Sequence, residues 1–395
     1  RQAHRGQRAG RTRGAVLPLT TQSRPLTAHS RLLALDVFRG LTIAGMIVVN
    51  TPGTWTHVYP PLLHAEWHGW TPTDTIFPFF LFIVGVSMAF SFAGRTAGGA
   101  SRRRLFFHAL RRGAIIFGLG LALNVLSFFV FHRDHLRIPG VLQRIGIVFI
   151  LSAAVFLGFG RKGVLAVTLA LLLGYWALMA LVPVPGYGAG RLDRDGNLAS
   201  YVDRLVLGAH TWKPGWDPEG PLSTIPAVAT TLLGALAGEW LRTASLRHKL
   251  VGLVAGGLLP LGAGALWQRV FPLNKNLWTS SYALFMSGLA ALFLALTLEI
   301  VDRRGWKGWA RPFEWLGRNP IAAFVASTLG TILMLAVKLP NPGGKPRSLY
   351  ATIYRTVFDR FTDPRLGSLL FALAYLALWM AVFGLLYRRR VFLKV

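Results

Sequence analysis

The chain contains a series of apolar segments of about 20 residues, each long enough to cross the hydrocarbon core of a bilayer as a helix. Some of them contain Pro or Gly, which membrane helices tolerate. The strands of a β-barrel would be about half as long and would alternate with period two. The sequence therefore predicts an all-α, polytopic helical membrane protein with about ten transmembrane helices. The expected spans are 33–51, 75–93, 112–131, 138–159, 164–182, 222–241, 250–268, 279–300, 318–337 and 366–387.

The charged residues predict the orientation of these spans. Only 15% of the 395 residues are charged, yet the net charge is +28. Such a charge is also found in proteins that bind nucleic acids. Here, however, most Lys and Arg lie in the tail and in alternate loops, as in "SRRRLFFHALRR" and "RTASLRHK", although the 338–365 loop departs from the trend. This positive-inside pattern predicts that both termini are cytoplasmic and that the partner is membrane lipid rather than nucleic acid.

Two regions of different composition indicate the domain organisation. Residues 1–31 are rich in Arg, Gly, Thr and Ser and lack the apolar core of a signal peptide, so we expect a basic, disordered cytoplasmic tail. Residues 32–395 are expected to form one transmembrane domain. The absence of cysteine excludes disulfides, thiolate chemistry and Cys-based metal sites within this sequence.

The segment "PPLLHAEWHGWTPTD", 60–74, collects polar side chains directly before the second span. His64 and His68 are four residues apart and would share one face of a helix, a spacing that can bind zinc. Glu66, however, comes two residues after the first histidine, whereas the HExxH motif has Glu directly after it. No third ligand is evident, so we predict no metal site.

Acid–base chemistry is the alternative that the position of His64 favours. An unperturbed imidazole has a pKa near ~6.5, so it can accept and return a proton near neutral pH. Asp74, at the mouth of the second span, could orient this imidazole or hold a cationic substrate. Equally, His64 could belong to an aromatic belt with Trp55, Trp67 and Trp70 at the membrane interface. The residues alone leave both interpretations open.

Charged and amide side chains also occur inside or at the ends of the apolar segments. Asp36 and Arg39 are three residues apart and can pair across one helical turn. Asn50, at the outer end of the same span, would approach His64 if the following loop folds back. Arg144 lies within an apolar segment, where an unpaired charge costs ~3 kcal/mol or more, so it needs a partner or an anionic ligand.

Two compact polar clusters, "DPEG" and "NKNLW", precede later spans. Carboxylate, amide and aromatic groups together suit the hydroxyls and ring face of a sugar, but helix-capping turns have the same composition. The residues concerned are Asp217, Glu219, Asn274, Lys275, Asn276 and Trp278.

Eight segments in order carry a family resemblance: "RLLALDVFRGLTIAGMIVVN", "HAEWHGWTPTDTIFPFFLFIVG", "RIPGVLQRIG", "VPVPGYG", "YVDRLVLG", "DPEGPLSTI", "LNKNLW" and "YRRRVFLKV". Together they resemble the heparan-α-glucosaminide N-acetyltransferase family. The resemblance implies an acyltransferase that moves an acetyl group from cytoplasmic acetyl-CoA to the amine of an amino sugar at the outer face, without a metal. It also implies a homodimer.

The resemblance assigns roles to residues at matching positions. It implies that His64 is the active-site histidine, as base or acetyl carrier, with Asn50 and Asp74 beside it. Acetyl-CoA contacts are expected at Arg39, Arg144, Asn274 and Lys275. Contacts with the acceptor are expected at His68, Asp217, Glu219, Asn276 and Trp278.

This sequence differs from the lysosomal enzyme of that family. It has a short basic tail in place of a large luminal domain, and it has no cysteines, so a bacterial inner membrane is the expected location. His68 stands where the lysosomal enzyme has Asn, which leaves the acceptor open. The alternative function is an amino-sugar transporter of the N-acetylglucosamine type, since a helical bundle with a polar cavity also suits a carrier.

Overall fold

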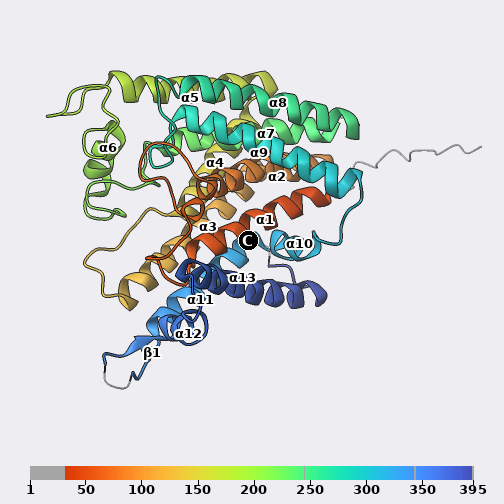
Figure 1. Ribbon diagram of the computed structural model, residues 1–395. Helices are drawn as coiled ribbons and strands as arrows, with labels where there is room; N and C mark the ends of the chain where they lie inside the picture. The colour runs from red at the N-terminus through yellow and green to blue at the C-terminus, as the bar shows by residue number, and fades with distance from the viewer. Residues whose placement is uncertain (1–31, 244, 342–343, 394–395) are drawn as a thin grey trace, which may run out of the picture. The chain divides into compact units, whose positions relative to one another are not determined.

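The computed structural model describes residues 32–243, 245–341 and 344–393. The predicted basic tail, 1–31, lies outside the described residues. The long helices of the described chain are α1 (Leu33–Asn50), α2 (Ile76–Ala97), α3 (Arg102–Val130), α4 (Val141–Gly158), α5 (Arg161–Leu181), α7 (Thr224–Thr243), α8 (Leu246–Trp267), α9 (Ser280–Leu298), α11 (Pro320–Ala336) and α13 (Pro364–Arg388) (Figure 1).

Short elements join or extend these helices. They are η1 (Pro60–Leu62), η2 (Pro72–Thr75), α6 (Leu198–Leu207), η3 (Glu299–Arg303), α10 (Arg311–Arg318), β1 (Lys338–Leu339), β2 (Arg347–Ser348), α12 (Leu349–Ile353) and η4 (Tyr354–Phe358). The two strands form an antiparallel pair in which Lys338 faces Ser348.

The described helices confirm the predicted fold class. Nine of them are long and apolar enough to cross a membrane, or up to ten spans if α10 and α11 are counted as one bent span. That pair turns through 89° at Asn319, directly before Pro320. Proline removes a backbone donor and is tolerated in the first turn of a helix, so α11 begins there as a new helix. The protein is a polytopic helical membrane protein.

Polar side chains cap several of the long helices. Ser101 accepts a hydrogen bond from the backbone N–H of Arg104 at the start of α3, and Ser245 accepts one from His248 at the start of α8. Asp363 does the same for Arg365 of α13, which also has Pro364 in its first turn. Each cap satisfies a backbone N–H group that has no partner within its own helix.

Helices α2 and α7 form the centre of the membrane domain. Their apolar windows are 61% and 67% buried, whereas those of α3 and α8 are 17% buried. Glycines allow the two helices to approach each other closely: a Cβ atom on Gly85 would lie 1.9 Å from the Thr231 carbonyl oxygen, and one on Gly234 would lie 2.0 Å from the Phe82 carbonyl oxygen. Small residues at such crossings are typical of membrane helix packing.

Loops from distant parts of the sequence meet beside the helix bundle, around α6 (Figure 1). The α1–α2 loop contacts the α8–α9 loop through a hydrogen bond from Gly69 N–H to the Leu273 carbonyl oxygen, 2.8 Å long. The Trp67 indole N–H donates to the Leu192 carbonyl oxygen of the α5–α6 loop at 2.7 Å. These contacts hold together the segments that carry the polar residues described next.

Candidate functional site

A histidine–carboxylate pair lies at the entrance to α2. His64 Nδ1 is 2.7 Å from Asp74 Oδ1. The His64 side chain is 50% exposed, whereas that of Asp74 is 1% exposed. Because an ionised carboxylate only accepts hydrogen bonds, the His64 Nδ1 atom carries the proton and Nε2 keeps its lone pair. Nε2 is therefore the accepting nitrogen of a partly exposed ring, and Lys275 Nζ lies 3.1 Å from it.

The local sequence fixes the Asp74 carboxylate. Its Oδ2 atom accepts hydrogen bonds from the backbone N–H groups of Ala65 and Thr71, both at 3.0 Å, and from the Thr71 hydroxyl at 3.2 Å. Thr71 precedes the short helix η2, so Asp74 folds back on the residue that begins that helix. With Oδ2 engaged in this way, Oδ1 is directed at His64.

Lys275, from the α8–α9 loop, completes the group. Its Nζ atom lies 2.9 Å from His64 Nδ1, 3.1 Å from Nε2 and 3.5 Å from Asp74 Oδ1. The side chain is 17% exposed. Burial lowers the pKa of Lys275, and the charges of Asp74 and Glu219 oppose this effect. His64, Asp74 and Lys275 together form the candidate catalytic cluster.

His68 lies next to this cluster and contacts the same loop. Its Nδ1 atom is 3.3 Å from Asn274 Nδ2, which donates because Asn274 Oδ1 already accepts from the Leu277 backbone N–H. Burial lowers the pKa of His68, so its neutral form is favoured. The α1–α2 loop, which carries His68, is thus hydrogen-bonded to the α8–α9 loop at Asn274, the residue directly before Lys275.

Arg144 is buried inside the bundle, on the first turns of α4, and is 1% exposed. Its Nη2 atom donates to the Gly220 carbonyl oxygen at 3.1 Å and to the Ser223 hydroxyl, and its guanidinium lies 5.3 Å from the centre of the Trp278 ring. Nε and Nη1 have no hydrogen-bond partner among the described residues. The protein therefore provides hydrogen-bond partners for only one of the three guanidinium nitrogens of Arg144 within the described residues.

A second buried network holds the two predicted carboxylates of the "DPEG" segment. Arg137 donates to both oxygens of Asp217, at 2.8 and 2.7 Å, and to Glu219. Asp203 of α6 accepts from the Asp217 backbone N–H at 2.9 Å, and its other oxygen is buried without a partner in the described chain. Burial raises the pKa of Asp203 to about 7.

Sequence reasoning did not single out Arg137 or Asp203. The only signal for Arg137 was its place beside a span on the less basic side of the protein, and Asp203 lies in a helix that hydropathy does not mark. The roles of Asp217 and Glu219 towards an acceptor stay predictions, and both carboxylates are already engaged by Arg137.

The remaining predicted residues lie at other points. The expected pair forms in α1, where Arg39 Nη1 is 3.1 Å from Asp36 Oδ1; Arg39 also donates to Ser87 at 2.6 Å. Arg39 and Asn50 are eleven positions apart, about 16 Å along a helix. Asn50 is exposed at the end of α1, and its approach to His64 stays a prediction.

Two other predicted residues come from the "NKNLW" segment. The Trp278 indole is 1% exposed and donates to the Thr230 hydroxyl at 3.2 Å, so the ring lies beneath the site. Asn276 is half-buried. Within residues 32–243, 245–341 and 344–393, no group of three or more His, Asp or Glu side chains could hold a metal ion.

The chain is thus a polytopic helical membrane protein whose loops bring together a histidine, a buried carboxylate and a lysine. The family model described as "Heparan-alpha-glucosaminide N-acetyltransferase, catalytic" matches residues 31–255, and the chain belongs to this family.

Two curated relatives match along almost the whole chain. Heparan-alpha-glucosaminide N-acetyltransferase of Homo sapiens is 29% identical over 97% of this chain and 62% of its own length. The Mus musculus protein of the same name is 28% identical over 96% of this chain and 63% of its own length. The chain thus spans about three fifths of the length of these relatives.

Proposed function

We propose that the protein is a transmembrane N-acetyltransferase that moves an acetyl group from cytoplasmic acetyl-CoA to the amine of an amino sugar at the outer face of a bacterial inner membrane. Family membership and the names of the two relatives support the reaction class. The basic loops support the orientation, because CoA carries phosphate charges and would meet the Arg- and Lys-rich side.

The contact between His64 Nδ1 and Asp74 Oδ1 is the observation that carries the proposal. An amino sugar arrives as an ammonium ion, which cannot attack a thioester until it loses a proton. Nε2 of His64 accepts that proton once the substrate amine replaces Lys275, which lies 3.1 Å from it, and Asp74 stabilises the imidazolium that results. General base catalysis of this kind contributes about 10² to 10⁴ in rate.

The groups around the catalytic cluster fit acetyl-CoA, which supplies the acetyl group as a thioester. Lys275 and Arg144 are cationic and lie within a buried polar region. The unpartnered Nε and Nη1 atoms of Arg144 are available to a carbonyl or phosphate oxygen. Arg39 would act further along α1, towards the proposed cytoplasmic side.

Asn50 is assigned the role of hydrogen-bond donor to the carbonyl oxygen as charge develops there. One such donor contributes ~3 kcal/mol. In the competing mechanism His64 itself attacks and carries the acetyl group on its ring. Incubation with radiolabelled acetyl-CoA in the absence of acceptor separates the two, because label retained on wild-type protein and lost in His64→Ala would exclude a simple base.

The test of the function is release of free CoA by purified protein, with and without glucosamine. We expect glucosamine-dependent release that disappears in His64→Ala. His57→Ala is the matched control, since His57 is exposed in the same loop and its side chain hydrogen-bonds with Thr56. If acetyl-CoA neither binds nor turns over, the proposal fails and transport of an amino sugar becomes the function to test in proteoliposomes.

A further inference from the structure

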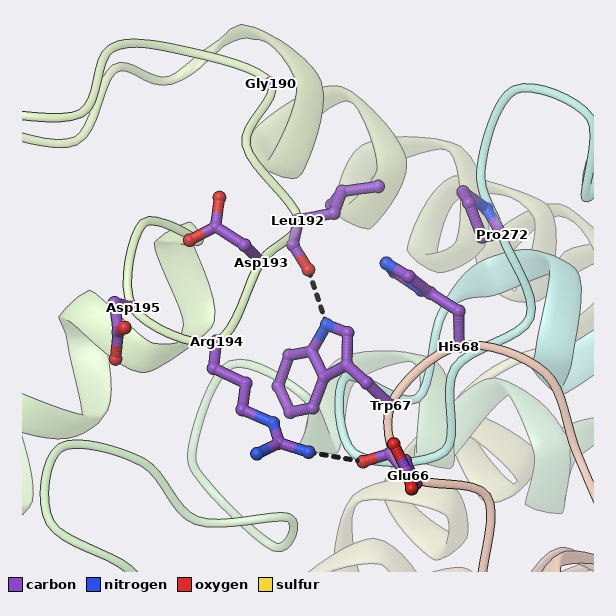
Figure 2. A pocket seen from close by; sticks show the side chains of 9 residues that line it. All are labelled: Glu66, Trp67, His68, Gly190, Leu192, Asp193, Arg194, Asp195 and Pro272. Carbon is purple, nitrogen blue, oxygen red and sulfur yellow. Dashed lines mark hydrogen bonds between the residues drawn. The ribbon is translucent and has the colours of Figure 1, made fainter.

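Helix α1 connects two polar regions of the protein. At its C-terminal end it leads into the loop that carries His64, and Trp67 of this loop lines the open pocket that Figure 2 shows. The first two turns of α1, at the opposite end, carry Asp36 and Arg39. Arg39 is the proposed contact for acetyl-CoA towards the cytoplasmic side. The groups that hold Arg39 therefore bear on binding of the acetyl donor rather than on the chemistry of the His64 ring.

The C-terminal end of α10 contacts Arg39 and its partner. Arg39 Nη1 donates to the Gly317 carbonyl oxygen at 2.9 Å and lies 3.1 Å from Asp36 Oδ1. Arg318 Nε is 4.0 Å from the other oxygen of Asp36. A Cβ atom on Gly317 would lie 1.8 Å from the Asp36 carbonyl oxygen, so α1 and α10 are in close contact here. A displacement of the end of α10 therefore changes both the direct contact with Arg39 and the charge that faces Asp36.

Asn319 lies at the 89° corner between α10 and α11 and is 1% exposed. Its backbone N–H donates to the Leu316 carbonyl oxygen and closes α10. Its side-chain Oδ1 atom accepts from the Leu393 backbone N–H at 2.8 Å, and Nδ2 makes a longer contact of 3.5 Å with the Val391 carbonyl oxygen. A buried amide needs such partners, because an unsatisfied one is costly. Residues 391–393, here named the clamp segment, are therefore bound directly at the end of α10.

Two aromatic rings hold the guanidinium of Arg318. Its central carbon lies 5.0 Å from the centre of the Tyr387 ring and 5.5 Å from the centre of the Phe392 ring. Arg318 Nη2 and the Tyr387 hydroxyl both donate to Glu314 Oε1, at 2.6 and 3.0 Å. A planar guanidinium stacks on aromatic faces, which fixes its orientation. Because Phe392 belongs to the clamp segment, this segment helps to orient the cation that faces Asp36.

A turn at the end of α13 directs the clamp segment to this corner. Arg390 has a φ angle of 55°, in the left-handed region that residues other than Gly rarely adopt. Its N–H donates to the Tyr387 carbonyl oxygen at 3.0 Å, and that of Val391 donates to the Leu386 carbonyl oxygen at 2.9 Å. These two bonds form a Schellman motif, which ends the helix. Such a conformation persists where neighbouring contacts stabilise it, and the hydrogen bonds at Asn319 are contacts of this kind.

We propose that the clamp segment acts through Asn319 and Arg318 to hold Arg39 in position for binding of acetyl-CoA. Asn319 and Arg318 are thus positioning residues, since they act on the donor through Arg39. This inference rests on the proposed acetyltransferase function. Because these contacts lie at the end of α1 opposite the His64 loop, their loss weakens binding of acetyl-CoA and leaves the chemical step at His64 unchanged.

The experiment measures the Kd of acetyl-CoA by calorimetry on detergent-solubilised protein, together with KM and kcat for CoA release with glucosamine. Leu393→Pro removes the backbone N–H that donates to Asn319 and leaves every side chain of α10 in place. We expect Kd and KM for acetyl-CoA to rise by about threefold to tenfold, the effect of one hydrogen bond, with kcat unchanged. Leu393→Ala is the matched control, because it keeps the N–H and should bind acetyl-CoA as the wild-type protein does.

A second pair of variants tests the contact with Arg318. Phe392→Ala removes the ring that lies 5.5 Å from the guanidinium and should raise the Kd of acetyl-CoA, again with kcat unchanged. Phe392→Tyr keeps the ring and should restore the wild-type Kd. Melting temperatures of all variants show whether the fold is retained.

The outcomes separate this inference from the proposed function. An unchanged Kd in Leu393→Pro and Phe392→Ala overturns the clamp, and so does a fall in kcat and melting temperature at constant Kd, which indicates a structural role alone. Binding of acetyl-CoA that depends on the clamp segment, without turnover in wild-type protein, would preserve the clamp and remove the acetyltransferase. Failure of wild-type protein to bind acetyl-CoA overturns both.

Discussion

His64 Nδ1 lies 2.7 Å from Asp74 Oδ1, and this contact joins a half-exposed ring to a fully buried carboxylate ten residues later. Asp74 is itself held by backbone N–H groups of the same loop. The ring is therefore oriented by a group that cannot move without breaking the turn that begins η2. This rigidity is what a base acting on a bound substrate needs.

Replacing Asp74 by Asn should lower kcat by at least about a hundredfold, because Nδ1–H loses its charged partner and the imidazolium is no longer stabilised. The KM for acetyl-CoA should change little. The measurement is the initial rate of CoA release with glucosamine. Asp134→Asn is the control for loss of one carboxylate, and thermal melting of both variants checks the fold. A variant at position 74 with nearly wild-type kcat would remove Asp74 from the mechanism.

Replacing Lys275 by Met should lower kcat/KM by about tenfold, the effect of one charge-assisted contact. The Lys275 Nζ atom lies within 3.1 Å of both ring nitrogens of His64 and 3.5 Å from Asp74 Oδ1, so the variant loses a group that contacts both partners of the pair. The initial rate of CoA release with glucosamine measures this loss.

Lys275→Arg retains the positive charge and should keep most of the activity. An unchanged kcat/KM in Lys275→Met would show that the ammonium does not act on the pair. An equal loss in both variants would indicate that the shape of the lysine side chain, rather than its charge, is responsible.

Hydropathy predicted the membrane fold well because it reports directly on burial in hydrocarbon. It was less informative about where helices begin. The third span was expected at 112–131, but α3 begins at Arg102, since a helix can continue through charged residues once it leaves the apolar phase. It also did not indicate the 89° bend before α11, because Pro320 was included within one continuous span at 318–337.

The candidate site was predictable where its residues are close in sequence. His64 and Asp74 lie ten residues apart in the same loop, so the sequence itself brings them near each other. The contact of Lys275 with His64 joins residues 211 positions apart, and no local pattern specifies it. Arg137 and Asp203 were missed for the same reason, because their partners come from other loops.

The free energy of unfolding should depend on pH through Asp203. Burial raises its pKa to about 7 from the ordinary value of 3.8, so the folded state binds a proton that the unfolded state has released between these values. The contribution of Asp203 to the free energy of unfolding is therefore highest below about pH 4. It falls as the pH rises and is constant above about pH 7. The size of the change is on the order of a few kcal/mol.

Asp203→Asn should remove this part of the pH dependence, because the amide cannot ionise. Melting temperatures in detergent at about pH 5 and about pH 8 give the comparison. The difference between the two should be smaller in the variant than in wild-type protein. Asp134→Asn, which alters an exposed carboxylate, should retain the wild-type difference, and equal differences in all three proteins would contradict the role of Asp203.

Replacing Gly85 by Ala should destabilise the packing of α2 against α7. The added Cβ would lie 1.9 Å from the Thr231 carbonyl oxygen, a backbone atom that can move only with its helix. Overpacking of this kind costs about 1–3 kcal/mol, and the melting temperature should fall.

Gly94→Ala is the matched control within the same helix, since nothing lies within 4 Å of a Cβ there. It should be neutral or stabilising by up to about 1 kcal/mol, because Ala favours the helix. Since η2 and α2 are continuous in the chain, displacement of α2 also moves Asp74 away from His64. Gly85→Ala should therefore lose activity as well as stability, whereas loss of stability with full kcat would show that the catalytic cluster is positioned by its loop alone.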